Sequence, residues 1–253
     1  MRYPLIVGHE IIGKVIQVGS QAGNFRIGDV VGVGCQSDSC LSRHGDCDAC
    51  EKGEENYCPR KVSTYNSTHA NSDKAQGRYA LYNRTPGHFV VKIPLEIAPK
   101  HAAPMLCAGL TVYSPLKRYK VGPGKSIGII GIGGLGHFAI LFVKAIGSRV
   151  VALSQKDNKR RDAFELGADD FISTENENWA SGRARTLDII INTISSLKVS
   201  SIFRGSSIFH KEVTVSFWNN YTILKCSRYH LPTISVFSRL AALLFSLVRL
   251  MMH

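Results

Sequence analysis

Apolar and polar positions follow a strand–turn–helix–strand pattern in the second half of this chain. An apolar run from Ile127 to Ile130 leads into glycines, apolar residues at helical spacing continue to Gly147, and a second run typical of a strand covers Arg149 to Leu153. Short continuous apolar runs are typical of buried parallel strands, and apolar residues three and four apart indicate a helix. The segment TLDIIINTISS, residues 186–196, indicates a further strand. The pattern predicts the start of a parallel α/β sheet.

The regions on either side of this unit differ from it. The segment IPLEIAPKHAAPML, residues 93–106, leaves a strand-rich region and enters a helix, so we expect a domain boundary between about residues 100 and 120. After Ser196 no strand–helix alternation continues, and we expect residues 197–253 to be an unmatched tail read from an intron or a shifted frame. Genuine divergence is an alternative, and so is a membrane-surface helix over residues 234–252, although Arg239 and Arg249 interrupt it.

Charge and composition narrow the classes of partner. The 253 residues carry a formal net charge of +12, which suits a polyanion or a phosphate-bearing cofactor. The cations are scattered and no helix-turn-helix or aromatic RNA motif accompanies them, so we expect no nucleic-acid partner. We expect no membrane partner either. No secretory signal opens the chain. Its seven cysteines are odd in number and suit metal binding more than disulfides, which fits a reducing compartment, so we expect a cytoplasmic protein.

Four cysteines form a metal-binding pattern within residues 35–60. Cys40, Cys47, Cys50 and Cys58 have six, two and seven residues between them. Four thiolates suit Zn²⁺ and leave no open position, so the pattern predicts a structural site in a loop with little else to pack. A disulfide-linked or free-thiol loop and a nucleic-acid-binding zinc ribbon are the alternatives. Cys35 lies outside the pattern, and we expect it to be a buried thiol.

The glycines after the first apolar run are spaced G-x-G-x-x-G, at Gly131, Gly133 and Gly136. In this strand-to-helix context the spacing predicts a dinucleotide-binding loop. The second strand ends in Ser154 and a basic stretch, residues 156–161, instead of a carboxylate. Cations favour a 2′-phosphate, so we expect NADP(H). The alternative is a solvated basic first turn of the next helix. We also expect Thr193 to face the cofactor.

Two isolated residues complete the pattern. His9 and Cys107, each taken alone, are more typical of structural positions than of metal ligands. Together with GHEIIGKVIQVGS, GDVVGVG, the cysteine lobe, AAPMLCAGLTVYSPL and GIGGLG, they follow the order of motifs in one family. Over about residues 3–195 the chain resembles the zinc-dependent medium-chain alcohol dehydrogenases, and most of all their NADP(H)-dependent cinnamyl alcohol dehydrogenase branch.

The resemblance implies an α/β fold in two incomplete domains. Residues 1–108 would form a GroES-like, β-rich catalytic domain with the zinc lobe, and residues 109–196 an NADP-binding Rossmann domain. His9 and Cys107 match two ligands of the catalytic zinc, and Glu10 matches the acidic residue that approaches the metal. The lobe cysteines match the structural zinc ligands. The residues that match the cofactor site are Thr111 near the nicotinamide, Gly131, Gly133, Gly134, Leu135 and Gly136 in the phosphate loop, and Ser154 and Lys159 at the 2′-phosphate.

The resemblance also implies an activity, which is hydride transfer between NADPH and an aromatic or medium-chain aldehyde at zinc. The family's first zinc ligand and its proton relay lie upstream of the GHE segment, so we expect weak zinc binding at His9 and little turnover by the chain as written. A non-catalytic remnant that binds zinc and NADP(H) is the alternative. The intact family is dimeric, and we do not expect the homodimer to persist in this chain.

Overall fold

The computed structural model of the protein describes residues 3–43, 45–175, 178–194, 214–218 and 221–225. The chain divides into two compact units, and the division falls between Leu110 and Thr111. The two units have different architectures, the first built on antiparallel pairs and the second on a mainly parallel sheet.

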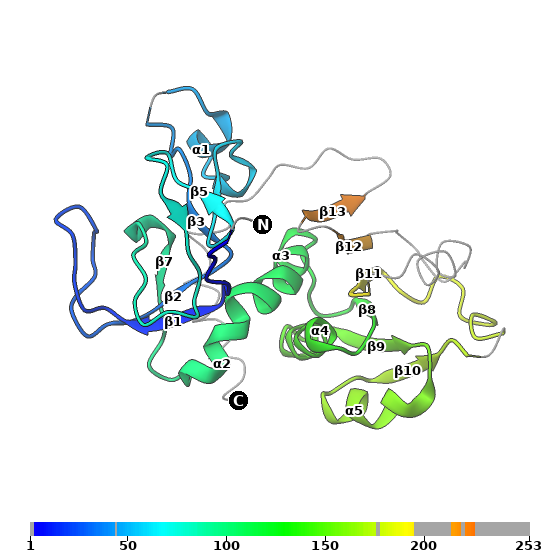
Figure 1. Ribbon diagram of the computed structural model, residues 1–253. Coiled ribbons are helices and arrows are strands. Elements are labelled where there is room, and N and C mark those ends of the chain that lie inside the picture. The colour runs from blue at the N-terminus through cyan, green and yellow to red at the C-terminus, as the bar shows by residue number, and fades with distance from the viewer. Residues whose placement is uncertain (1–2, 44, 176–177, 195–213, 219–220, 226–253) are drawn as a thin grey trace. The chain divides into compact units, whose positions relative to one another are not determined.

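The first unit is built around a small antiparallel sheet in the order β1-β2-β7 (Figure 1). Its strands are β1 (Ile11–Lys14), β2 (Val30–Val33) and β7 (Val90–Lys92). Two two-stranded pairs accompany it, β3 (Gln36–Asp38) with β4 (Val62–Ser63) and β5 (Ser67–Thr68) with β6 (Lys74–Ala75). The short helices are α1 (Asp48–Glu51) and the 3₁₀ turns η1 (Glu55–Tyr57) and η2 (Gly87–Phe89).

A helix with one wide turn closes the first unit. It consists of α2 (Pro99–Pro104) and the π-helical turn η3 (Met105–Gly109), and it continues into α3, which spans Leu110–Arg118. Leu106 of the π turn is 1% exposed and packs on β2, where a Cβ atom built on Gly32 would lie 2.7 Å from its Cδ1. Single π turns inside α-helices are frequent at functional sites. This one carries Cys107.

The second unit contains a six-stranded sheet in the order β10-β9-β8-β11-β12-β13 (Figure 1). The predicted strands and helix are confirmed, as β8 (Ser126–Ile130), α4 (Gly134–Ala145), β9 (Arg149–Ser154) and β11 (Ile189–Asn192). β10 (Asp170–Ser173) pairs with β9 in parallel, and η4 (Asp157–Lys159) and α5 (Arg160–Glu165) connect them. The order of the first five strands is that of a dinucleotide-binding fold. Its core includes Ile130, Val151, Leu153, Ile172, Leu187 and Ile190.

The sheet continues into the region where we expected no further strand. β12 (Thr214–Trp218) lies parallel to β11, and β13 (Tyr221–Lys225) pairs antiparallel with β12. The expectation was therefore wrong for these residues, whose sequences TVSFW and YTILK are rich in the β-branched and aromatic residues that favour strands. The remainder of the predicted tail, including Cys226 and residues 234–252, lies outside the described residues.

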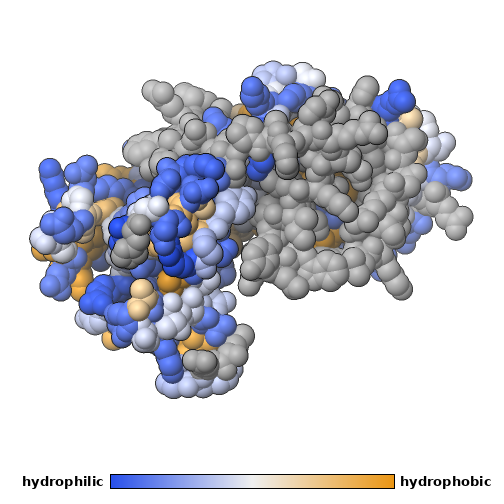
Figure 2. Space-filling model, turned by 90° about the horizontal axis from the view of Figure 1, so that it is seen from above, coloured by the Kyte–Doolittle hydropathy of each residue, from blue (hydrophilic) through white to orange (hydrophobic). Residues whose placement is uncertain are grey.

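The described surface is mainly polar. Figure 2 shows hydrophilic residues over most of the coloured atoms on that face, with small apolar areas between them. Large exposed apolar side chains do occur, such as Tyr79, Leu81 and Leu95. Within the described ranges, no helix combines the length and the apolar character that crossing a lipid bilayer would require.

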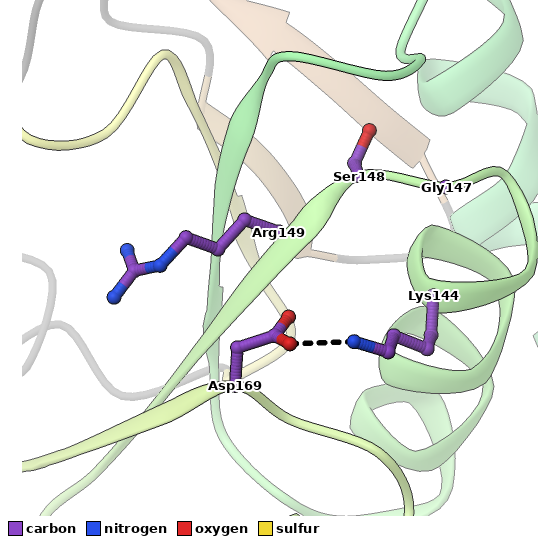
Figure 3. Close-up of a pocket in the computed structure, with 5 residues that line it drawn as sticks. All are labelled: Lys144, Gly147, Ser148, Arg149 and Asp169. Atoms are coloured by element: carbon purple, nitrogen blue, oxygen red, sulfur yellow. Dashed lines mark hydrogen bonds and ion pairs between the residues drawn. The ribbon is translucent and has the colours of Figure 1, made fainter.

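One open cavity of about 380 Å³ lies at the amino ends of the parallel strands (Figure 3). Lys144, Gly147, Ser148, Arg149 and Asp169 line it, and the Lys144 Nζ atom lies 2.5 Å from Oδ1 of Asp169. Ligands of open α/β sheets bind at the carboxyl ends of the strands. We therefore assign this cavity a structural role, in which the ion pair joins the end of α4 to the start of β10.

Replacing Lys144 with Met should remove a small, pH-dependent contribution to stability. Desolvation would raise the pKa of Asp169, but hydrogen bonds from Lys144 and from the Val150 N–H outweigh it and hold the pKa below 3.8. A lowered carboxyl pKa stabilises the fold above the unfolded value and loses that contribution as the pH falls through the folded value. Because the pair is partly exposed, we expect Lys144→Met to cost about 0.5 kcal/mol at pH 7.

Urea unfolding at several pH values tests this expectation. The cost of Lys144→Met should shrink as the pH falls below 3.8 and disappear once the pH is below the lowered pKa of Asp169 in the folded chain. Lys100→Met is the matched control, because Lys100 is exposed and forms no ion pair among the described residues. A cost that stays the same at pH 3 would show that the lysine acts through packing instead.

Candidate metal and cofactor sites

The backbone of the GHE segment is held against a second segment of the first unit. The N–H of Gly77 donates to the carbonyl of Ile6 at 2.8 Å, and the N–H of Arg78 donates to the carbonyl of Gly8 at 3.1 Å. Gly8 has φ of +103°, and a Cβ atom built on Gly77 would overlap the backbone of residues 7 and 8. Both positions therefore require glycine. This close pairing fixes the chain immediately before His9.

The structure brings His9, Glu10 and Cys107 together. Nε2 of His9 lies 3.2 Å from Sγ of Cys107, and one donor atom from each of the three residues lies within 4.8 Å of the others. All three side chains are half-buried. Burial, with the nearby charges of Cys35 and Glu10, raises the pKa of Cys107 to about 12. A divalent cation would reverse that preference, because a coordinated thiol is deprotonated.

Nitrogen, sulfur and carboxylate donors fit zinc. Three protein ligands with a fourth position open to water or substrate are the usual arrangement of a catalytic zinc site, whereas structural sites are closed by four protein ligands. The cluster of His9, Glu10 and Cys107 is therefore a candidate for an open site.

The four cysteines of the predicted lobe also converge. Sγ of Cys40 lies 3.5 Å from that of Cys50 and 3.4 Å from that of Cys58, and Sγ of Cys47 lies 3.8 Å from that of Cys58. A tetrahedron with Zn–S bonds of about 2.3 Å places its sulfurs about 3.8 Å apart, whereas a disulfide needs about 2.05 Å. The described cysteines are all free thiols, so the geometry favours zinc over the disulfide alternative.

Arg60 supports the lobe from outside. Its guanidinium binds Asp46 through two hydrogen bonds of 2.7 and 2.5 Å, and its backbone N–H donates to Sγ of Cys58 at 3.3 Å. Desolvation would raise the pKa of Cys40, but hydrogen bonds, chiefly from Arg60, lower it to about 6. Burial raises the pKa of Cys58 to about 12. The lobe thus offers one thiol that ionises near neutral pH, and a cation would stabilise ionisation of the others.

The prediction for Cys35 is wrong, because this residue is exposed. β2 ends at Val33, so Cys35 falls in the link to β3, where the alternation of buried and exposed positions breaks. Its carbonyl accepts a hydrogen bond from the Thr64 N–H at 3.0 Å. It belongs to neither group of candidate metal ligands.

A second cavity, of about 300 Å³, lies at the carboxyl ends of β8, β9, β10 and β11 in the second unit. This is where a sheet of this order binds a dinucleotide. Of the predicted cofactor residues, Gly131, Gly133, Ser154, Lys159 and Thr193 line it, whereas Thr111, Gly134, Leu135 and Gly136 do not. The other lining residues are Ile130, Ile132, Leu153, Gln155, Thr174 and Ile194.

Close packing explains the glycines. Gly131 has φ of +89°, and a Cβ atom built on Gly136 would overlap the carbonyl oxygen of Gly131. The Thr193 hydroxyl donates to the Ile130 carbonyl at 2.8 Å and lies 3.1 Å from that of Gly131. α4 begins with Gly133 as its N-cap, and no side chain caps it. Its first N–H groups are therefore available to an anion such as a pyrophosphate.

The basic stretch fits both interpretations made from the sequence. Nζ of Lys159 lies 2.8 Å from Oδ2 of Asp162, and the two following arginines form similar local pairs with Asp157 and Glu165. Lys159 nevertheless lines the cavity. An exposed pair of this kind contributes less than about 1 kcal/mol, so a phosphate can compete for the lysine.

Thr174 and Ile194 were not identified from the sequence. Thr174 follows β10 directly, Ile194 lies two residues after the end of β11, and Ser154 is the last residue of β9. The rule that ligands meet the carboxyl ends of parallel strands would have found them, once the order of the strands was known.

Comparison with known proteins supports the fold described for both units. The sequence profile of the alcohol dehydrogenase GroES-like domain matches residues 1–95. A cinnamyl alcohol dehydrogenase structure from Sorghum bicolor superposes with a TM-score of 0.83 and 32% identity, covering 98% of this chain and 73% of that one. The chain belongs to the zinc-dependent medium-chain alcohol dehydrogenase family. The resemblance stated from the sequence is thereby confirmed, as is the α/β fold with a GroES-like domain and a Rossmann-type sheet.

Two further relatives carry NADP in their names. NADP-dependent alcohol dehydrogenase 6 of Saccharomyces cerevisiae is 39% identical over 241 residues, which cover 93% of this chain and 66% of that protein. The cinnamyl alcohol dehydrogenase of Helicobacter pylori, solved with NADP(H), is 34% identical with a TM-score of 0.68, covering 77% of this chain and 54% of that one. This dehydrogenase chain spans between about half and two thirds of the length of the curated relatives it matches.

Proposed function

We propose that this protein transfers hydride between NADP(H) and an alcohol–aldehyde pair at a zinc ion held by His9, Cys107 and Glu10. The observation that carries the proposal is the convergence of these three donors within 4.8 Å, in a chain that also has a four-cysteine lobe. In this proposal residues 1–108 form the catalytic domain and residues 109–196 the dinucleotide-binding domain.

Each group of residues has a distinct task. Zinc, when bound, supplies a Lewis acid that polarises a carbonyl oxygen, and NADPH supplies the hydride. Nε2 of His9, Sγ of Cys107 and a carboxylate oxygen of Glu10 would hold the metal. Cys40, Cys47, Cys50 and Cys58 hold the structural ion and keep the lobe folded. Gly131, Gly133 and the N-terminus of α4 bind the pyrophosphate, and Gly134, Leu135 and Gly136 shape this turn.

Ser154 and Lys159 favour NADP(H) over NAD(H). Both line the cavity at the end of β9, where the ribose 2′ position of a dinucleotide lies in this fold. A hydroxyl and an ammonium attract a 2′-phosphate, whereas the carboxylate usual in NAD enzymes would repel it. Thr111 is assigned to the nicotinamide end. The names of the relatives support the same cofactor.

The substrate class is a small aldehyde or its alcohol, either aromatic or medium-chain. It is supported by the cinnamyl alcohol dehydrogenases among the relatives. Neither a nucleic acid nor a membrane is part of the proposal. We place the reaction in the cytoplasm, where the lobe cysteines would stay reduced.

The cofactor assignment can be tested by titration with NADPH and NADH, followed by fluorescence. We expect NADPH to bind at least about tenfold more tightly, since one charge-assisted hydrogen bond contributes about 1.5 kcal/mol or more. Lys159→Ala should lower the NADPH affinity about tenfold and leave the NADH affinity unchanged. Lys156→Ala is the matched control, because Lys156 belongs to the same basic run but does not line the cavity.

The activity is tested by NADPH oxidation with cinnamaldehyde. The zinc-loaded protein should consume NADPH, and His9→Ala should abolish turnover while leaving NADPH binding intact. Saturable NADPH binding without aldehyde reduction would instead identify a non-catalytic remnant that binds zinc and NADP(H). Salt-sensitive DNA binding would point to the nucleic-acid alternative.

A further inference from the structure

A tyrosine lies against the candidate zinc ligand His9. The ring of Tyr65 stacks on the His9 imidazole, with the centroids 6.0 Å apart and the planes at 27°. This separation and tilt lie within the range of aromatic pairs that attract each other. Both residues are half-buried and belong to the first unit.

Among the residues that the structure describes, only one of the two imidazole nitrogens of His9 has a polar partner. Nε2 of His9 faces Sγ of Cys107, and no described residue provides a hydrogen-bond partner for Nδ1. A metal-binding histidine usually donates its second N–H to a carboxylate or a carbonyl, which fixes the orientation of the ring. At His9 the Tyr65 ring instead contacts the face of the imidazole.

The residues on either side of Tyr65 fix its backbone. The residue before it, Thr64, is 2% exposed, donates its N–H to the Cys35 carbonyl at 3.0 Å and donates its hydroxyl to the Gly34 carbonyl at 2.5 Å. Asn66, the residue after it, has φ of +56°, which turns the chain sharply. Within the described part of the chain the Tyr65 hydroxyl has no hydrogen-bond partner. The tyrosine therefore contacts His9 through its ring.

We propose that Tyr65 is a positioning residue that orients the His9 ring for metal binding. The inference rests on the proposed function, because it needs a metal at His9. It requires the aromatic face and not the hydroxyl, so Phe should replace Tyr65 and an aliphatic residue should not.

Metal affinity and the absorption spectrum of the cobalt-substituted full chain test this inference without an activity assay. Competition with a chromophoric chelator gives the zinc affinity of the weaker site, which His9→Ala identifies. We expect Tyr65→Leu to weaken that site about 10- to 100-fold and to shift the ligand-field bands of Co²⁺. Tyr65→Phe should stay within about threefold of the parent and keep its spectrum.

Two controls separate positioning from folding. Tyr82→Leu removes an exposed tyrosine from the same unit and should leave both zinc affinities unchanged. The lobe must keep its zinc in every variant. If Tyr65→Leu fails to fold, Tyr65→Met carries the same expectation with a flexible side chain of similar reach.

The outcomes distinguish this inference from the proposed function. A parent chain that binds two zinc ions, with a Tyr65→Leu variant of equal affinity and spectrum, would overturn the role of Tyr65 alone. A parent chain that binds one zinc ion and does not respond to His9→Ala would overturn the catalytic metal site, and the role of Tyr65 with it.

Discussion

Cys58→Ser is expected to remove one zinc ion per chain and to unfold the lobe of residues 40–58. The lobe has little apolar packing of its own: α1 has no buried residue, and the buried apolar side chains within this segment are those of Cys47 and Cys58. A structural zinc contributes on the order of 10 kcal/mol to the folding of small zinc domains. We expect local stability to fall by about 4 kcal/mol or more, which corresponds to about 1000-fold faster amide exchange in the lobe.

Hydrogen exchange with mass spectrometry, together with zinc analysis, measures this effect. Cys35→Ser is the matched control, because Cys35 lies close in sequence but outside both groups of candidate ligands. The zinc content of Cys35→Ser and the amide exchange of its lobe should match those of the parent. If Cys58→Ser kept both its zinc and its slow exchange, the tetrathiolate assignment would be wrong.

Gly136→Ala should be strongly destabilising, although alanine is by about 1 kcal/mol the better helix former. The added Cβ atom would overlap the carbonyl oxygen of Gly131, which is backbone and cannot rotate away. Overpacking of a rigid site costs about 1–3 kcal/mol, so after the gain of about 1 kcal/mol in helix propensity we expect a net loss of up to about 2 kcal/mol. The turn must also open, which displaces the N–H groups at the start of α4, and we expect NADPH affinity to fall at least tenfold.

Thermal unfolding and NADPH titration follow the two parts of this prediction. Gly122→Ala is the comparison variant, because a Cβ atom at Gly122 meets nothing within 4 Å and its φ is not in the left-handed region. It should lie within about 0.5 kcal/mol of the parent. Equal stability of the Gly136 and Gly122 variants would show that the loop can shift, and that close packing does not explain this glycine.

The sequence predicts best what is local. β8, α4 and β9 follow from apolar runs and from glycines that lie next to one another in the chain. The four lobe cysteines were found because their spacing alone suggests one metal ion. The pairing of His9 with Cys107 came from the resemblance to a family, since nothing in the spacing of two residues so far apart predicts a 3.2 Å contact.

The predictions that failed depended on tertiary context. Cys35 follows an apolar run, but the strand ends before it, and where a strand ends is the least reliable part of a sequence-based prediction. β12 and β13 lie in a region without a visible period, and the pairing of β12 with β11, on which β13 then adds, is non-local. The stacking of Tyr65 on His9 joins two loops, for which no sequence pattern exists.

The π-helical turn at Met105–Gly109 makes the candidate metal site sensitive to the number of residues as well as to their identity. A π turn accommodates one residue more than an α-helical turn. Deleting a single residue such as Ala108 would allow a regular α-helix to form with the flanking turns near their present register, and Cys107 would then leave the widened turn that now places it beside His9. Insertions and deletions at this turn therefore test the alignment of Cys107 with His9 in a way that no substitution can.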